Sequence, residues 1–153
     1  MAQFAFGRLT VGRIQLLREW PPGFGGIERV AHELAVVWGE TVFSFDAQRS
    51  QSAGSRAALD PLPVDYPRRC LRSVQLGRLM LPLPSHHLFT LLLSKLPLHG
   101  HLPSPGVLLI LVLAKVLQPQ RVVSVHWHAF LESRRHDFQG CLFQLYQWTA
   151  LNL

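Results

Sequence analysis

The sequence predicts an α/β protein with an open, mostly parallel, Rossmann-like sheet and helices on both of its faces. Near the N-terminus, an apolar run, a glycine-rich turn, an amphipathic stretch and a β-branched run follow one another, which is the order of a βαβ unit. A similar alternation returns between residues 96 and 126. The length of 153 residues suits one domain with a proper core.

The first βαβ unit begins with an apolar run at residues 13–19, which ends in the turn cluster at residues 20–26. Gly39 ends the helix that follows, and the β-branched and aromatic residues 41–45 predict the second strand. The right-handed crossover expected of such a unit makes the two strands parallel. The apolar residues of the helix recur at the spacing of one helical face, and they are Ile27, Val30, Ala31, Leu34, Ala35 and Trp38.

The rest of the chain alternates in the same way after a polar stretch at residues 48–58, which predicts a surface loop. Residues 106–117 are apolar on nearly every side, which is typical of a helix buried against a sheet. We expect strands at 74–76, 96–101 and 121–126, and helices at 86–95, 106–117 and from residue 138 onward.

Composition limits the classes of protein. Apolar residues make up 48% of the chain and charged residues 16%, which excludes a disordered chain. Two cysteines cannot form a disulfide framework, so we expect a reducing, cytoplasmic location. The longest uncharged apolar run, residues 107–114, falls short of the roughly 20 residues that span a bilayer, although the chain could lie peripherally on a membrane.

The formal net charge of +6 is concentrated in one part of the chain. No acidic residue occurs between Asp65 and Glu132, and this interval includes a Leu- and Pro-rich basic segment at residues 66–121. Its basic residues are Arg68, Arg69, Arg72, Arg78, Lys95, Lys115 and Arg121. We expect this segment to meet an anionic membrane surface or a lipid-linked phosphate. We do not expect nucleic acid as a partner, because aromatic residues are not interleaved with the basic ones.

The glycine-rich turn could form a phosphate cradle. Gly25 and Gly26 stand immediately before a predicted helix, where unpaired N–H groups and the helix dipole favour an anion. The same glycines would equally serve a tight turn without a ligand. The dinucleotide pattern needs a third glycine where Glu28 stands, but Gly23 fits it and Asp46 occupies the place of a ribose-binding acid. An NAD(P)-dependent oxidoreductase therefore stays open as an alternative.

Two histidine pairs end predicted strands: His99 with His101, and His126 with His128. Residues at i and i+2 share a face of a strand, so each pair could present two imidazoles to one metal ion. Three of the four histidines with a water would make a catalytic zinc site, which keeps a zinc hydrolase open as a second alternative. Neither pair has an acidic residue or cysteine near it, and we assign no metal ligand from the sequence.

Three segments in order resemble the N-terminal domain of family 4 glycosyltransferases. Residues 21–35 resemble the first loop and helix of that family. Residues 99–105 are similar to its His-x-His-x-Pro-x-Pro stretch, and residues 122–128 look like its strand ending in Trp-His. The resemblance covers nearly the whole chain. It implies that residues 1–153 form a single acceptor-side domain, which is one half of a two-domain GT-B fold.

The resemblance also implies roles for individual residues. Gly25 and Gly26 would offer backbone N–H groups to the donor diphosphate, or to the face where the donor meets the acceptor. His128 would be the catalytic histidine beside the transferred sugar. The acceptor side would be formed by His101, Ser104 and Trp127. No metal and no cofactor is implied, since the nucleotide-sugar donor is a co-substrate.

The chain departs from the family in one respect. The C-terminal half of the family carries the nucleotide-binding pocket and two glutamates eight positions apart, and no pair among the five glutamates here has that spacing. We therefore expect the donor-binding domain to be absent from this chain, which would be either truncated or completed by a second chain. The complete enzyme would transfer a sugar from a nucleotide-sugar to a glycan or lipid-linked acceptor, and this chain alone would be inactive.

Overall fold

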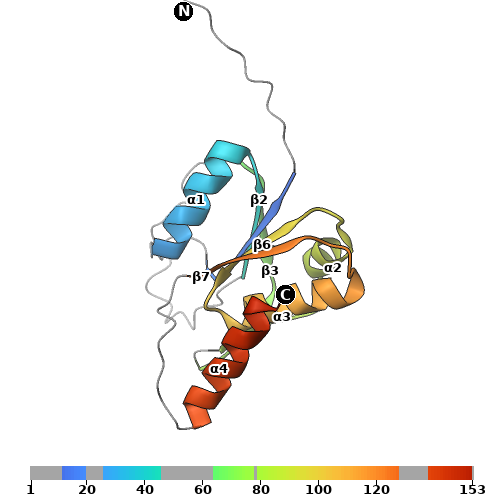
Figure 1. The fold of residues 1–153 in the computed structure, drawn as a ribbon. Coiled ribbons are helices and arrows are strands. Elements are labelled where there is room, and N and C mark those ends of the chain that lie inside the picture. Colours follow the sequence, from blue (N-terminus) through green and yellow to red (C-terminus); the bar gives the residue numbers. More distant parts are fainter. Residues whose placement is uncertain (1–11, 20–25, 46–63, 78, 128–137, 153) are drawn as a thin grey trace, which may run out of the picture.

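The computed structural model describes residues 12–19, 26–45, 64–77, 79–127 and 138–152, and they form an α/β fold with an open, Rossmann-like sheet (Figure 1). Five strands make one all-parallel sheet in the order β3-β2-β1-β6-β7. These strands are β1 (Ile14–Leu17), β2 (Thr41–Phe45), β3 (Arg68–Leu71), β6 (Leu98–Leu102) and β7 (Val123–Trp127). A separate antiparallel ribbon pairs β4 (Ser73–Leu76) with β5 (Leu79–Pro82).

Helices cover both faces of the sheet, as the sequence predicts. The helix α1 (Gly26–Trp38) lies on one side, and α2 (His86–Leu93) and α3 (Pro105–Leu117) lie on the other (Figure 1). The C-terminal helix α4 (Phe138–Leu151) extends the layer of α3. None of the helices in the described ranges is long and apolar enough to cross a bilayer.

The core is divided by the sheet into two layers, because successive side chains of a strand point to opposite faces. On the α1 side, Leu17 and Val42 pack against Ala31 and Ala35 of the helix and against Tyr66. The larger layer on the other side buries apolar residues of β1, β2 and β6 against α2 and α3. The apolar stripe of α1 and the nearly all-apolar α3 therefore bury their side chains as their sequence patterns predict.

Most expected elements are confirmed, with shifted ends. The strand at residues 41–45 matches β2, and the expected helices at 86–95 and 106–117 correspond to α2 and α3. The sequence did not predict β3 or β5, because β3 (RRCL) has the composition of a loop and β5 ends at a proline. The expected strand at 74–76 lies in the two-stranded ribbon, and the expected loop at 48–58 falls outside the described residues.

Two glycines bring α3 close to the strands beneath it. A Cβ atom at Gly100 of β6 would lie 2.5 Å from Cδ1 of Leu111, and a Cβ atom at Gly106 would lie 2.1 Å from the carbonyl oxygen of Met80. At Gly106 the close atom belongs to the backbone and cannot give way, whereas at Gly100 a side chain would force Leu111 to move. The absence of a Cβ at these positions sets how α3 begins beside the carboxyl end of β6.

Candidate functional site

The candidate site lies where the strand order of the sheet reverses. The chain runs from β1 outward to β2 and β3, and then returns to place β6 on the other side of β1. In open α/β sheets, ligands bind beyond the carboxyl ends of the strands at this kind of reversal. Here the carboxyl ends of β1 and β6 flank the reversal, and β7 lies next to β6.

The residues predicted for donor binding are only partly within the described chain. Gly26 is the first residue of α1, and a Cβ atom built on it would meet nothing within 4 Å. Gly25 and His128 lie outside the described residues. Gly26 thus occupies the helix N-terminus that follows β1, which is the position expected for a phosphate cradle.

The residues predicted for the acceptor side are separated by the sheet. His101 pairs with His126 across β6 and β7, whereas Trp127 pairs with the next residue, Leu102, so their side chains point to opposite faces. The ring of Trp127 packs against Tyr146 of α4, with 5.5 Å between the ring centroids. His101 therefore belongs to the α1 side of the sheet, and Trp127 belongs to the side of α3 and α4.

Ser104 precedes α3 as its N-cap residue, but its side chain makes no capping hydrogen bond. Its backbone N–H donates to the hydroxyl of Tyr146 over 2.7 Å, which ties the start of α3 to α4. Ser104 is 2% exposed and His101 is 1% exposed. Both residues are thus buried at the end of β6, where they hold this end of the strand in position.

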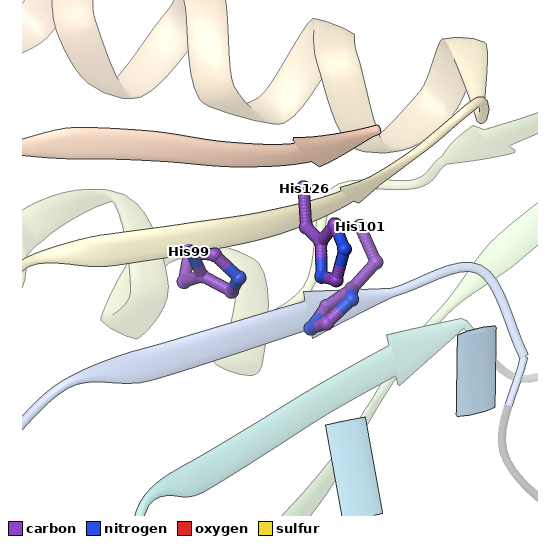
Figure 2. Close-up of side chains that lie close together, drawn as sticks. All are labelled: His99, His101 and His126. Carbon is purple, nitrogen blue, oxygen red and sulfur yellow. The ribbon is translucent and has the colours of Figure 1, made fainter. Parts of the chain in front are cut away.

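The structure brings three of the four predicted histidines together. His99 and His101 share one face of β6, and His126 stands beside His101 on β7. Figure 2 shows the three rings on the same side of these strands. One ring nitrogen of each histidine lies within 4.8 Å of the other two. His101 is buried, and His99 and His126 are half-buried.

A chain of hydrogen bonds determines that Nε2 of His101 carries a proton. The Glu40 carboxylate can only accept, so the side-chain amide nitrogen of Gln15 donates to it over 2.6 Å. The amide oxygen of Gln15 therefore faces His101, and Nε2 of His101 donates to it over 2.9 Å. In the neutral ring this leaves the lone pair on Nδ1 of His101.

Ser124 orients the ring of His99. The Ser124 hydroxyl oxygen lies 2.8 Å from Nδ1 of His99 and 3.3 Å from the carbonyl oxygen of Leu98. The rings of His99 and His101 are thus each oriented by a hydrogen bond at one nitrogen.

The buried acid behind this chain is charge-balanced. Glu40 forms an ion pair with Arg13, whose guanidinium also stacks 4.4 Å from the ring centroid of Trp38. Glu40 and Gln15 are both buried. The interaction with Arg13 offsets the cost of burying the carboxylate, which then polarises His101 through Gln15.

The sequence analysis missed the residues that orient the histidines, namely Gln15, Glu40 and Ser124. One signal for Gln15 was present, because it is the polar residue in an otherwise apolar buried strand (IQLL). A buried polar side chain needs a hydrogen-bond partner. The partners of Gln15 come from distant parts of the sequence, so only the folded sheet shows them. Glu40 and Ser124 carry no comparable signal, since acids and serines are common next to strands.

No family model, curated protein or solved structure matches the chain. The functional argument therefore depends on the strand order, the histidine cluster and the surface of this chain.

Proposed function

We propose that this chain is the acceptor-side domain of a nucleotide-sugar-dependent glycosyltransferase with a GT-B fold. The observation that carries the proposal is the reversal of strand order between β1 and β6. Two of the three segments that resemble family 4 glycosyltransferases contribute described residues to this edge: Gly26 after β1, and His101 through Ser104 at the end of β6. The third segment includes β7, which is the neighbour of β6.

In this proposal, the start of α1 meets the phosphate-bearing part of the ligand. Gly26 has no Cβ to block the backbone N–H groups of the first helical turn, and the helix dipole adds positive charge there. His101 and Ser104 are buried and act as positioning residues. A second α/β domain would bind the nucleotide part of the donor.

We also propose an anionic membrane as a partner surface, which suits a lipid-linked acceptor. Phe89 and Leu93 of α2, with Val116 and Leu117 of α3, are exposed apolar residues on two helices that contact each other. Gln118 joins the two helices by donating to the carbonyl oxygen of Leu92 over 2.8 Å. Among the basic residues of the segment 66–121, the exposed ones in the described chain are Arg69, Arg72 and Lys95. Exposed apolar and basic side chains together favour an interfacial position on anionic lipid.

The test of the glycosyltransferase proposal is a ligand titration followed by NMR spectroscopy of the isotope-labelled chain. The ligands are a sugar phosphate, a polyprenyl-phosphate-linked sugar, UDP- and GDP-sugars, and NADH. We expect saturable shifts at Gly26 and at the end of β6 with the phosphate-bearing sugars. Shifts with NADH alone would favour the oxidoreductase, and no shift at this edge with any sugar ligand would contradict the proposal.

The variant Gly26→Ala separates binding from folding. Its Cβ enters open space, so we expect stability to be kept or raised by about 0.4–1 kcal/mol. The same Cβ hinders close approach of a phosphate, so we expect binding to weaken roughly fivefold, the equivalent of about one hydrogen bond. Val37→Ala is the matched control, because Val37 is an exposed residue of the same helix.

A further inference from the structure

The cluster of His99, His101 and His126 goes beyond the glycosyltransferase proposal and does not depend on it. We propose that these three histidines bind one divalent transition-metal ion, with zinc as the expected ion. No metal ligand could be assigned from the sequence alone, because acids and cysteines are missing around the histidine pairs. Three imidazoles alone are nevertheless a known ligand set for zinc, with the fourth position held by water.

The distances fit a site that is nearly formed. In a tetrahedral site with Zn–N bonds of about 2.0–2.1 Å, ligand nitrogens are about 3.3 Å apart. The three ring nitrogens of the cluster already lie within 4.8 Å of one another. All three side chains come from adjacent strands of one sheet, so small side-chain rotations close the remaining gap without moving the backbone.

The hydrogen bonds behind the rings are those that metal-binding histidines need. A metal-bound histidine usually donates its other N–H to an oxygen atom, which fixes the ring and increases its basicity. Here His101 donates to Gln15, which in turn donates to Glu40, and His99 is hydrogen-bonded to Ser124. Two of the three rings are therefore held in place by hydrogen bonds to oxygen atoms. We infer that His101 would bind through Nδ1 and His99 through Nε2.

The chemistry of the cluster selects the kind of metal. Neutral imidazoles suit zinc, copper, nickel and cobalt, whereas magnesium and calcium prefer carboxylate and carbonyl oxygens. No carboxylate belongs to the cluster as the described residues define it. The bound ion would keep its positive charge, so its open position would attract hydroxide or an anionic oxygen.

The test uses the full chain after its metal has been removed with a chelator. Cobalt(II) is titrated as a visible probe, and zinc(II) is then added in competition. We expect saturation at one equivalent of cobalt, the visible bands of tetrahedral coordination, and loss of these bands as zinc displaces the cobalt. X-ray absorption of the zinc form should show imidazole nitrogens at about 2.0–2.1 Å. A folded chain that binds no cobalt, or binds it with an octahedral spectrum, would overturn the proposal.

Variants assign the site to these residues. We expect His126→Ala to lower affinity more than about 100-fold, and Ser124→Ala, which leaves all three ligands in place, to lower it about 10- to 100-fold. His86→Ala is the matched control, because His86 is an exposed histidine on α2, and we expect no change. If His126→Ala does not fold, the metal affinity of Ser124→Ala and the X-ray absorption spectrum decide whether the histidine cluster binds the metal. Equal losses in His86→Ala and Ser124→Ala would contradict the assignment.

Discussion

At the scale of single residues, burial controls the ionisation of both tyrosines of the chain. Tyr66 packs on the α1 side, and its hydroxyl lies 2.8 Å from Nδ1 of His32. Tyr146 lies on the other side and accepts the backbone N–H of Ser104. Burial raises the pKa of Tyr66 and the pKa of Tyr146 to about 12, from the ordinary value of 10.0.

These pKa values predict a loss of stability at alkaline pH. In the unfolded chain both phenols ionise near pH 10, whereas the folded chain keeps them neutral to about pH 12. Their contribution to the free energy of unfolding is therefore complete below pH 10 and is lost as the pH rises toward 12. The measurement is the ultraviolet absorbance of tyrosinate, with and without denaturant, beside denaturant midpoints over the same pH range.

The variant Tyr146→Phe provides the control for this titration. It removes one ionisable phenol and one hydrogen bond, so we expect a loss of about 1 kcal/mol below pH 10 and a shallower fall above it. Formation of tyrosinate near pH 10 in the folded wild-type chain would contradict the prediction.

At the scale of elements, Arg121 joins the end of α2 to the strands. This residue precedes β7 and is 4% exposed. Its Nη1 donates to the carbonyl oxygen of Leu91 in the last turn of α2, and its Nε donates to that of Leu96, over 2.9 and 2.8 Å. A cation at a helix C-terminus also interacts favourably with the helix dipole. Burial lowers the pKa of Arg121 from its usual value.

Replacing this arginine should destabilise the whole domain. Arg121→Met keeps much of the side-chain volume but leaves the carbonyls of Leu91 and Leu96 without these donors, so we expect a loss of about 3 kcal/mol in the free energy of unfolding. Lys95→Met is the matched control at an exposed basic residue, with an expected change within about 0.5 kcal/mol. Urea unfolding checks both values, and equal stability of the two variants would show that Arg121 has no such role.

At the scale of the whole molecule, the basic residues of the segment 66–121 fall into two groups: some are buried and join elements of the fold, and others are exposed to solvent. Arg121 is buried and joins elements, and Lys115 is half-buried and donates to the carbonyl oxygen of Arg121. The charge available to a partner is therefore smaller than the sequence suggests. It lies at exposed positions such as Arg72 and Lys95.

This arrangement predicts binding to anionic vesicles that weakens with added salt. We expect the double variant Phe89→Ser with Leu93→Ser to reduce vesicle partitioning about tenfold, since exposed apolar side chains enter the lipid interface. The variant should keep its fold, because Leu93 is 71% exposed and Phe89 is also exposed. Val37→Ser on the opposite face is the control. Vesicle sedimentation measures the effect, and equal binding to neutral and anionic vesicles at low salt would contradict the membrane proposal.

The sequence by itself determined the fold class and most of its elements. Apolar positions at helical spacing located α1, and the β-branched run TVFSF located β2, since such patterns depend only on which face of each element is buried. The histidine pairs were also visible as residues that share a strand face. Polar and short strands such as β3 were not predicted, because their pairing with a neighbour outweighs their own sequence preference.

Only the tertiary structure decided which of these residues meet. It joined His99 and His101 to His126, and it placed Trp127 on the other face of the sheet, because the register of β6 on β7 sets every side chain's direction. It also linked Gln15 to His101 across 86 positions of sequence. Periodicity is local and can assign a face within one strand, whereas contact between strands depends on their order and register.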